Sequence, residues 1–290
     1  MPHEKAANML NPQLTLNMGG KLLSLHRPVV MGILNVTPDS FFGGSRLASE
    51  LDLLRRAGLM LEEGAAILDI GGVSTRPGAE PITEEEERRR VIPSISAVIR
   101  HFPEALISVD TYRASIAATA VSEGAVMVND ISAGRLDESM YATVAELDVP
   151  YVLMHMRGSP QDMQRNPVYG DVVQEVLDFL IMETGKLRAL GVKDIIVDPG
   201  FGFGKTIEHN FQLLRNLHVF SILDLPVLAG ISRKSTIYKT LGVTPEEALN
   251  GTTALHMVAL QQGAAILRVH DVKPAIEVAR LWEALYQSPA

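Results

Sequence analysis

The sequence predicts a single (β/α)₈ barrel, and two observations carry this prediction. Eight short runs rich in Val, Ile and Leu recur along the 290 residues, and each closes with polar residues. Segments with apolar residues at helical spacing separate these runs, and such alternation favours parallel strands covered by helices on both faces. An open doubly wound sheet is the alternative architecture. The expected strands cover residues 29–36, 65–72, 106–111, 126–131, 150–156, 194–200, 226–232 and 264–271.

A β-hairpin is expected before the first of these strands. Residues 10–27 hold the segments LTL and KLLSL on either side of Asn17-Met18-Gly19-Gly20. Paired glycines favour a tight turn between two strands, so we expect this hairpin to close the bottom of the barrel. Residues 1–13 are expected to form an N-terminal tail, and residues 14–290 a single domain.

Helix start and stop signals lie between the expected strands. Residues 47–64 keep apolar side chains at helical spacing, and Gly64 is expected to end that helix. Thr83 and Glu86 predict a capping box at the start of a helix over residues 84–102. Further along, the segment Thr244-Pro245-x-Glu247 predicts another helix start by the same reasoning.

Composition narrows the range of functions. The formal charge is −8, with 26 Lys and Arg against 34 Asp and Glu, which argues against a general nucleic-acid binder. The chain has no cysteine, which excludes disulfides, thiolate metal sites and cysteine nucleophiles. No apolar run reaches the roughly 18 residues that a membrane-spanning helix needs, and the N-terminus does not resemble a signal peptide. We therefore expect a cytoplasmic protein without a membrane partner.

Polar side chains gather at the ends of the expected strands. In a (β/α)₈ barrel the active site lies at the carboxyl ends of the strands, so these residues are candidates for function. One polar strand end would be unremarkable, but a polar end on nearly every strand favours a site. The candidates are Asn35, Asp69, Asp110, Asn129, Asp130, His155, Asp198, Arg233, Lys234, Arg268, His270 and Asp271.

The candidates divide into cations and acceptors. Arg268 and His270 are two apart in the last strand, so we expect them to project from the same face and to hold an anion together. The pair Arg233-Lys234 follows the preceding strand, in the region where such barrels often bind phosphate. Asp110, Asn129 and Asp198 instead offer acceptors that suit a planar ring with adjacent N–H donors. The expected ligand therefore has a heterocycle at one end and a phosphate at the other.

Several familiar motifs are absent. The segment DPGFGFGKT (198–206) has neither the glycine spacing of a phosphate-binding loop nor that of a dinucleotide-binding loop. We interpret it as a glycine-rich loop that places Phe203 near a ligand. No HExxH motif or close histidine cluster indicates zinc, and GISRKS (230–235) lacks the spacing of a nucleophile elbow.

Eight motifs in order resemble the dihydropteroate synthase family, over residues 29–285. They are MGILNVTPDSF (31–41), DIGGVSTRPGAE (69–80), SVDT (108–111), VNDI (128–131), LMHM (153–156), DPGFGFGK (198–205), GISRKS (230–235) and RVHD (268–271). The resemblance implies condensation of 6-hydroxymethyl-7,8-dihydropterin diphosphate with p-aminobenzoate to 7,8-dihydropteroate and pyrophosphate, in folate biosynthesis. It further implies Mg²⁺ as cofactor, a homodimer formed through outer helices near the C-terminal end, and a target of sulfonamides.

The resemblance also implies a role for each matching residue. The catalytic residues would be Asp110, Lys234, Arg268 and His270. The pterin would be bound by Asp110, Asn129, Ile131, Met154, Asp198, Phe203, Gly230 and Lys234. The p-aminobenzoate would be framed by Thr75, Arg76, Pro77 and Ser235. The diphosphate would meet Asn35, Arg268 and His270, with Asn35 beside Mg²⁺.

The implied reaction is S_N1-like, because the dihydropterin ring can share positive charge on its methylene group. The sequence departs from the family pattern at two places: Val73 replaces the acid of GGESTRPG, and Phe42-Gly43 replaces the Ser-Asp pair of SFSDGG. Two rival functions are a pterin-binding methyltransferase and a pterin-binding protein without activity. The segments STRPG and SRKS and the pair of Arg268 and His270 argue against the methyltransferase, because a phosphorylated substrate needs them.

Overall fold

The computed structural model describes residues 15–36, 46–73, 81–163, 165 and 167–286. Within these residues, eight parallel strands close into one barrel in the order β10-β3-β4-β5-β6-β7-β8-β9. The predicted (β/α)₈ barrel is confirmed, and the open sheet is excluded because β10 pairs with β3. The barrel strands are β3 Val29–Asn35, β4 Ile67–Gly71, β5 Leu106–Asp110, β6 Met127–Asp130, β7 Tyr151–Met154, β8 Ile195–Asp198, β9 Val227–Ala229 and β10 Ala264–Val269.

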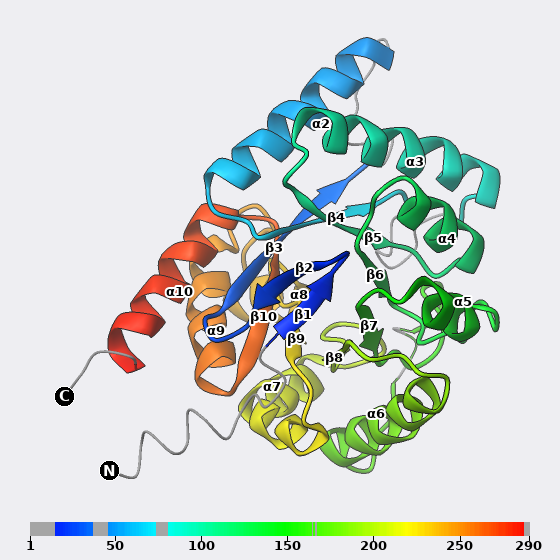
Figure 1. Cartoon of the computed structure of the whole chain (residues 1–290). Helices are drawn as coiled ribbons and strands as arrows, with labels where there is room; N and C mark the ends of the chain where they lie inside the picture. Colours follow the sequence, from blue (N-terminus) through cyan, green and yellow to red (C-terminus); the bar gives the residue numbers. More distant parts are fainter. Residues whose placement is uncertain (1–14, 37–45, 74–80, 164, 166, 287–290) are drawn as a thin grey trace.

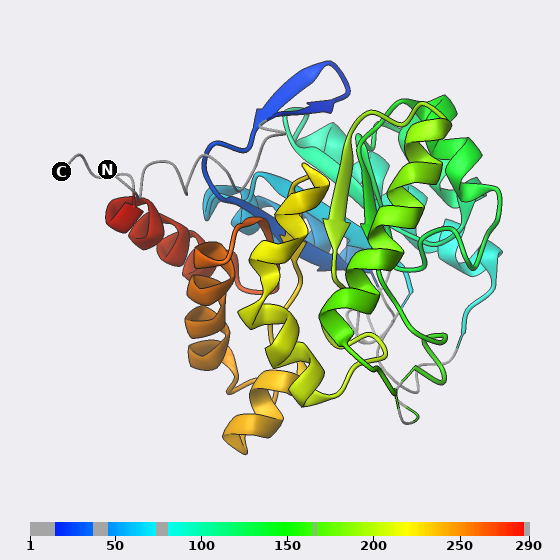
Figure 2. The same ribbon diagram turned by 90° about the horizontal axis from the view of Figure 1, so that it is seen from below.

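Helices surround the barrel, as Figures 1 and 2 show. Gly64, with φ of 104°, follows α2 and takes the left-handed backbone that ends it, as predicted. No helix in the described ranges combines the length and the apolarity needed to cross a membrane. The helices are α2 Arg46–Glu62, α3 Glu84–His101, α4 Ala114–Ser122, α5 Met140–Leu147, α6 Val172–Ala189, α7 Ile207–Arg215, the 3₁₀ helix η2 Leu217–Leu223, α8 Ser235–Leu241, α9 Leu249–Gln261 and α10 Val272–Tyr286.

Alternation along the strands divides the apolar residues into two clusters. In β3, Val30 and Leu34 face the helices, whereas Met31 faces the barrel interior. The interior cluster also receives one side chain from most other strands, for example Ile67 and Val152. These side chains fill the half of the barrel near the amino ends of the strands. Polar side chains are therefore left for the other end.

The predicted hairpin covers the filled end of the barrel. Strands β1 Thr15–Met18 and β2 Lys21–Ser24 pair antiparallel. They are joined at Gly19 and Gly20, with φ of 62° and 91°, which the tight turn requires. Leu16 and Met18 are fully buried against the interior cluster. The hairpin crosses this end in Figure 1, so ligands reach the interior from the opposite mouth.

Two local predictions were wrong in detail. Thr83 accepts the backbone N–H of Glu86 as predicted, but the Glu86 carboxylate binds Arg89 and Arg90 instead of closing a capping box. Helix α9 begins at Leu249, five residues after the predicted start at Thr244. Residues 244–248 form turns instead, in which Glu247 accepts the backbone N–H of Thr244 at 3.0 Å and the Arg233 guanidinium binds the carbonyl oxygens of residues 245 and 246.

Candidate active site

A network of charged side chains crosses the barrel interior just below its mouth. The Arg268 guanidinium donates from Nε to Asp69 Oδ2 and from Nη2 to Asp110 Oδ2, both at 2.6 Å. The amide of Asn129 donates to the same Asp69 oxygen at 2.9 Å. We call these four residues the Arg268 cluster. Asp69 therefore positions both Arg268 and Asn129, and the Asn129 amide oxygen is oriented away from it.

Strand pairing explains why this cluster forms. Strand β10 pairs with β3, β3 with β4 and β4 with β5, so residues 199 positions apart in the sequence meet in the interior. Gly71 lies opposite Asp110, and a Cβ on this glycine would stand 3.3 Å from Asp110 Oδ2. The glycine thus leaves room for the carboxylate. A charge within an apolar strand requires a partner, and Arg268 finds one in Asp69 Oδ2.

Burial and charge set the ionisation of the Arg268 cluster. Burial raises the pKa of Asp110 to about 7, although the charge of Arg268 opposes this shift. Burial lowers the pKa of Arg268, but the attraction of Asp69 and Asp110 outweighs it and holds that pKa above the ordinary value. Arg268 is therefore a permanent cation, whereas Asp110 gains or loses its proton near neutral pH.

The opposite wall of the mouth holds Asp198 and Lys234. Asp198 Oδ1 accepts the backbone N–H of Gly200 at 2.7 Å, and burial raises the pKa of this carboxyl. Lys234 donates to the carbonyl oxygen of Phe201, and its Nζ lies 4.5 Å from the centre of the Phe203 ring. Burial lowers the pKa of Lys234 to about 8, against the attraction of Asp198. Acceptor and donor groups thus stand side by side here.

Lys205 organises the glycine-rich loop that follows β8. Its Nζ donates to the carbonyl oxygens of Gly200 and Phe203 at 2.9 and 3.0 Å and contacts His155 Nδ1 at 2.9 Å. Burial lowers the pKa of Lys205 far below its ordinary value and the pKa of His155 to about 2. A Cβ at Gly200, where φ is 70°, would overlap the carbonyl of His155. Glycine at position 200 thus allows the loop to pass close to the backbone of His155.

An apolar cluster lines the mouth between these two walls. Three residues implied in pterin binding lie together there, namely Ile131, Met154 and Phe203. Met156 and Met163 belong to the same cluster, and the sequence reasoning did not assign them. Gly230 also faces the site, since a Cβ on it would stand 3.6 Å from Asp198 Oδ2. A flat ring could pack here with its polar edge toward Asp198.

Arg268 and His270 lie on either side of the end of β10 and contact different residues. Strand β10 ends at Val269, so Arg268 points into the interior, whereas His270 follows the strand at the exposed rim. The His270 Nδ1 lies 3.1 Å from Ser232 Oγ. The prediction that both residues lie within the last strand was wrong for His270, because the strand ends one residue before it.

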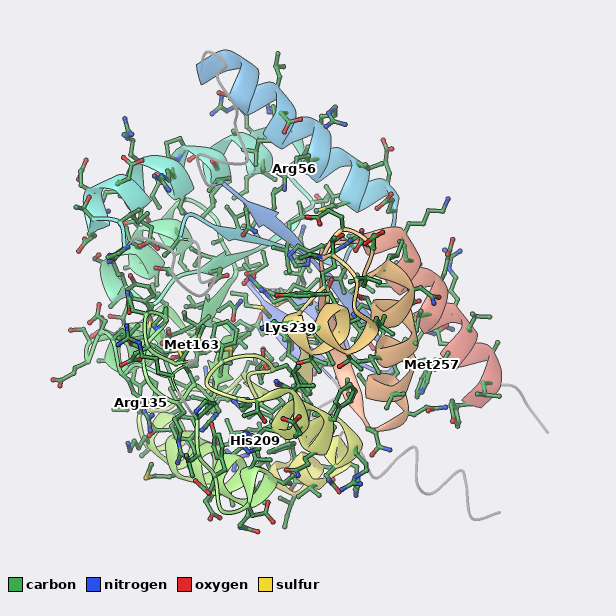
Figure 3. The ribbon with its side chains drawn as sticks, turned by 180° about the vertical axis from the view of Figure 1, so that it is seen from behind. Arg56, Arg135, Met163, His209, Lys239 and Met257 are labelled. Carbon is green, nitrogen blue, oxygen red and sulfur yellow. The ribbon has the colours of Figure 1, made fainter. Side chains whose placement is uncertain are left out.

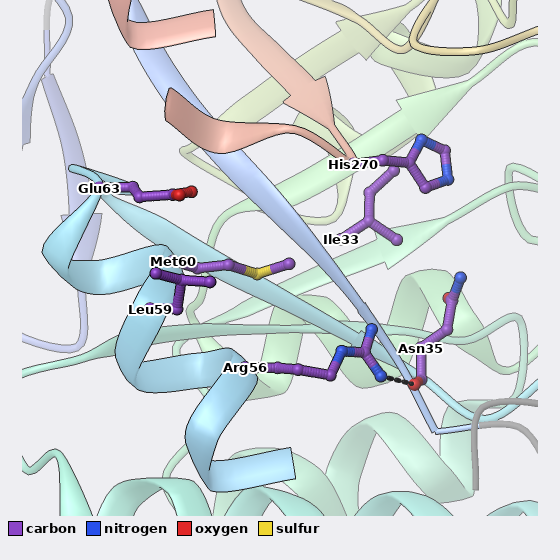
Figure 4. Close-up of a pocket in the computed structure, with 7 residues that line it drawn as sticks. All are labelled: Ile33, Asn35, Arg56, Leu59, Met60, Glu63 and His270. Atoms are coloured by element: carbon purple, nitrogen blue, oxygen red, sulfur yellow. Dashed lines mark hydrogen bonds between the residues drawn. The ribbon is translucent and has the colours of Figure 1, made fainter. Parts of the chain in front are cut away.

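His270 and Asn35 line a pocket of about 260 Å³ on the rim, together with Ile33, Leu59, Met60, Glu63 and Arg56. Arg56 reaches from α2 and donates to the carbonyl oxygen of Asn35 at 3.3 Å (Figure 4). Figure 3 shows Arg56 on its helix from the side opposite to that of Figure 1. Arg56 was not expected from the sequence, because its helix gave no signal other than an amphipathic pattern.

Arg233 serves the fold rather than an anion. It forms a bidentate ion pair with Asp271 at 2.7 and 2.9 Å, and its remaining nitrogen binds the two carbonyls before α9. Ser235 is the first residue of α8 and is half-buried. The expected p-aminobenzoate residues Thr75, Arg76 and Pro77 and the Phe42-Gly43 change lie outside the described residues. The same holds for the tail at residues 1–13.

A magnesium site would have to be shared with a ligand. Among the described residues, no three His, Asp or Glu side chains gather to hold a metal ion. Asn35 offers one amide oxygen at the pocket on the rim. Mg²⁺ binds oxygen and commonly keeps few protein ligands alongside substrate phosphates and water. The residues present therefore fit a Mg²⁺ ion that arrives with a diphosphate.

A family model described as "Pterin binding enzyme" matches residues 31–270. The dihydropteroate synthase of Escherichia coli strain K12 is 45% identical over 267 residues, covering 91% of this chain and 94% of that protein. The Xanthomonas albilineans dihydropteroate synthase structure with 4-aminobenzoic acid has a TM-score of 0.89 and 43% identity, covering 95% and 99% of the two chains. The structure of that synthase with 7,8-dihydropteroate has a TM-score of 0.85 and 40% identity, with coverage of 95% and 100%.

Proposed function

The chain belongs to the dihydropteroate synthase family of pterin-binding enzymes, and we propose that its barrel mouth performs each step of that reaction with the residues described above. The reaction joins 6-hydroxymethyl-7,8-dihydropterin diphosphate to p-aminobenzoate and releases pyrophosphate. One observation carries the assignment: acceptors from Asp110, Asn129 and Asp198 and cations from Lys234 and Arg268 face one mouth.

The pterin is proposed to lie flat between the apolar cluster and the polar walls. Its ring N–H and amino donors match the oxygens of Asp198 and Asn129, because a carboxylate and an amide accept two neighbouring bonds. Lys234 supplies the donor for the oxo group beside them. Phe203 and Met154 pack on the ring faces, which excludes water from this edge.

The reacting carbon is the methylene group that bears the diphosphate. We propose an S_N1-like path, in which the carbon–oxygen bond breaks with its electron pair leaving on pyrophosphate. The p-aminobenzoate nitrogen then forms the carbon–nitrogen bond and loses one proton to solvent. Asp110, held by Arg268, stabilises the positive charge that the ring shares with the methylene group. No strong general base is needed, because an aromatic amine is neutral at pH 7.

The diphosphate end is assigned to the rim. Asn35 and His270 would contact the leaving group, with Arg268 adding positive charge from the interior. Bound Mg²⁺ would neutralise negative charge on the departing diphosphate. Thr75, Arg76, Pro77 and Ser235 are proposed to frame p-aminobenzoate, where we expect sulfonamides to compete with it.

One assay tests the function against its rivals. The protein is incubated with the pterin diphosphate, p-aminobenzoate and Mg²⁺, and dihydropteroate and pyrophosphate are measured in equal amounts. Pterin binding without either product would favour a binding protein, and methyl transfer from a methylated pterin would favour a methyltransferase. Asn35→Ala should raise the Mg²⁺ concentration that gives half-maximal rate; an unchanged requirement would remove Asn35 from the metal site.

A homodimer in the cytoplasm is proposed as the native form. The outer helix α10 exposes Leu281 and Leu285, each 63% accessible, which is typical of an interface. Analytical ultracentrifugation should give twice the mass of the chain. Leu281→Glu should shift the mass to that of one chain, whereas Leu22→Glu, on the exposed hairpin, should leave the dimer intact. A single-chain mass for the native protein would refute the dimer.

A further inference from the structure

The charge of Arg268 is already matched before any substrate binds. Its guanidinium donates to Asp69 and Asp110, each at 2.6 Å, so one cation faces two carboxyl groups. A departing diphosphate carries several negative charges and needs donors that are not held this way. The departing diphosphate therefore needs a further cation besides Arg268.

Arg56 offers a cation of a different kind. Its Nη1 donates to a neutral acceptor, the carbonyl oxygen of Asn35, and the guanidinium lines the pocket on the rim with His270 (Figure 4). In the part of the chain that the structure describes, no carboxylate lies within ion-pair distance of it. A half-buried arginine without such a partner is costly, and an anion is the ligand that would compensate for this cost.

Two acidic residues close to Arg56 in the sequence have partners other than Arg56. Asp52, one helical turn before Arg56, forms an ion pair with Arg55 at 2.9 Å. Glu63, at the other end of the pocket, accepts the backbone N–H of Lys273 at 3.3 Å. The Arg56 end of the pocket, next to Asn35 and away from Glu63, is therefore the end that suits phosphate oxygens (Figure 4).

We propose that Arg56 is a further binding residue for the diphosphate of the substrate and for the pyrophosphate product. This inference rests on the proposed function and adds a residue on α2, outside the barrel strands, to the anion site. The Arg56 guanidinium would hold phosphate oxygens from the rim, while Arg268 adds positive charge from the interior. Arg56 would thus contribute to binding the leaving group and not to recognising the ring.

The test compares Arg56→Gln with the control Arg100→Gln, in which an exposed arginine of α3 loses its charge. Three quantities are measured on the full-length protein: product inhibition by pyrophosphate, affinity for 6-hydroxymethyl-7,8-dihydropterin without its diphosphate, and melting temperature. We expect Arg56→Gln to weaken pyrophosphate inhibition about tenfold and leave affinity for the unphosphorylated pterin unchanged, whereas Arg100→Gln matches the native protein. Arg56→Lys, which keeps the charge, should recover part of the loss.

Other results would overturn the inference. Pyrophosphate inhibition that is equal in Arg56→Gln and the native protein would show that Arg56 does not reach the anion. An equal loss of affinity for pyrophosphate and for the unphosphorylated pterin, with a lower melting temperature, would show that Arg56 only supports Asn35. A native protein that forms no dihydropteroate would instead refute the proposed function itself, so the two failures are distinguishable.

Discussion

Asp69→Ala is the change that most directly tests the Arg268 cluster. Asp69 contacts no expected substrate atom, but its Oδ2 accepts both Arg268 Nε at 2.6 Å and Asn129 Nδ2 at 2.9 Å. A hydrogen bond to a charged group contributes about 1.5–3 kcal/mol. Because Arg268 keeps Asp110 as a partner, we take the low end for each bond, which gives about 3 kcal/mol in total.

That free energy corresponds to a fall of about 100-fold in kcat/KM, since about 1.4 kcal/mol is a factor of ten. The assay is pyrophosphate release at saturating p-aminobenzoate, with circular dichroism to confirm the fold. Asp148→Ala, which removes an exposed carboxylate paired with Lys193, serves as the control and should keep native kinetics. A folded Asp69→Ala protein with native kcat/KM would refute the view that Asp69 positions Arg268 and Asn129.

Three further predictions concern pH dependence and stability. Because the pKa of Asp110 is about 7 and that of Lys234 about 8, kcat/KM should rise with pH through the first pKa and fall through the second. Lys234→Arg should remove the fall at alkaline pH, and a profile that does not change with pH would contradict these roles. Burial lowers the pKa of His256 from 6.5 to about 4, so the unfolded chain takes up a proton before the folded protein as the pH falls. Denaturant titrations should therefore show that the free energy of unfolding falls by up to about 3 kcal/mol between pH 6.5 and 4, and by less in the His256→Gln protein. Leu16→Ala should lower the free energy of unfolding by about 2–5 kcal/mol, because this hairpin side chain is fully buried. Leu22→Ala, on the exposed face of the hairpin, should change it by under about 0.5 kcal/mol, and equal effects of the two changes would mean that the hairpin does not pack on the barrel.

The fold could be predicted because its signals are local and repeated. Each barrel strand is a short apolar run, and Gly64 and the Gly19-Gly20 turn mark chain reversals that depend on neighbouring residues alone. The start of α9 was placed wrongly because its cause is distant. Glu247 accepts the backbone N–H of Thr244 as its position predicts, but Arg233 also binds the carbonyl oxygens of residues 245 and 246, and no pattern within residues 244–250 indicates that contact.

The sequence predicted which residues belong to the site better than it predicted which of them contact one another. The polar strand ends identified Asp110, Asn129 and Asp198, because parallel strands bring their carboxyl ends to one mouth. Asp69 was noted as a strand end, but its pairing with Arg268 depends on the closure of β10 onto β3. The sequence did contain a signal for this pairing, because Asp69 and Arg268 are both charged residues within apolar strands, and a buried charge requires a partner of opposite charge.

The position at which β10 ends also bears on the contacts of Arg268 and His270. Alternation predicts that Arg268 and His270 share a face, yet β10 ends between them at Val269. Arg268 is thereby committed to the interior carboxylates and His270 to the rim beside Asn35. A diphosphate at the rim, proposed to meet Asn35 and His270, then gains a further cation only from the surrounding helices in the part of the chain that the structure describes. Arg56 is the cation that α2 provides there, and its side chain could not be distinguished in the sequence from any exposed arginine of an amphipathic helix.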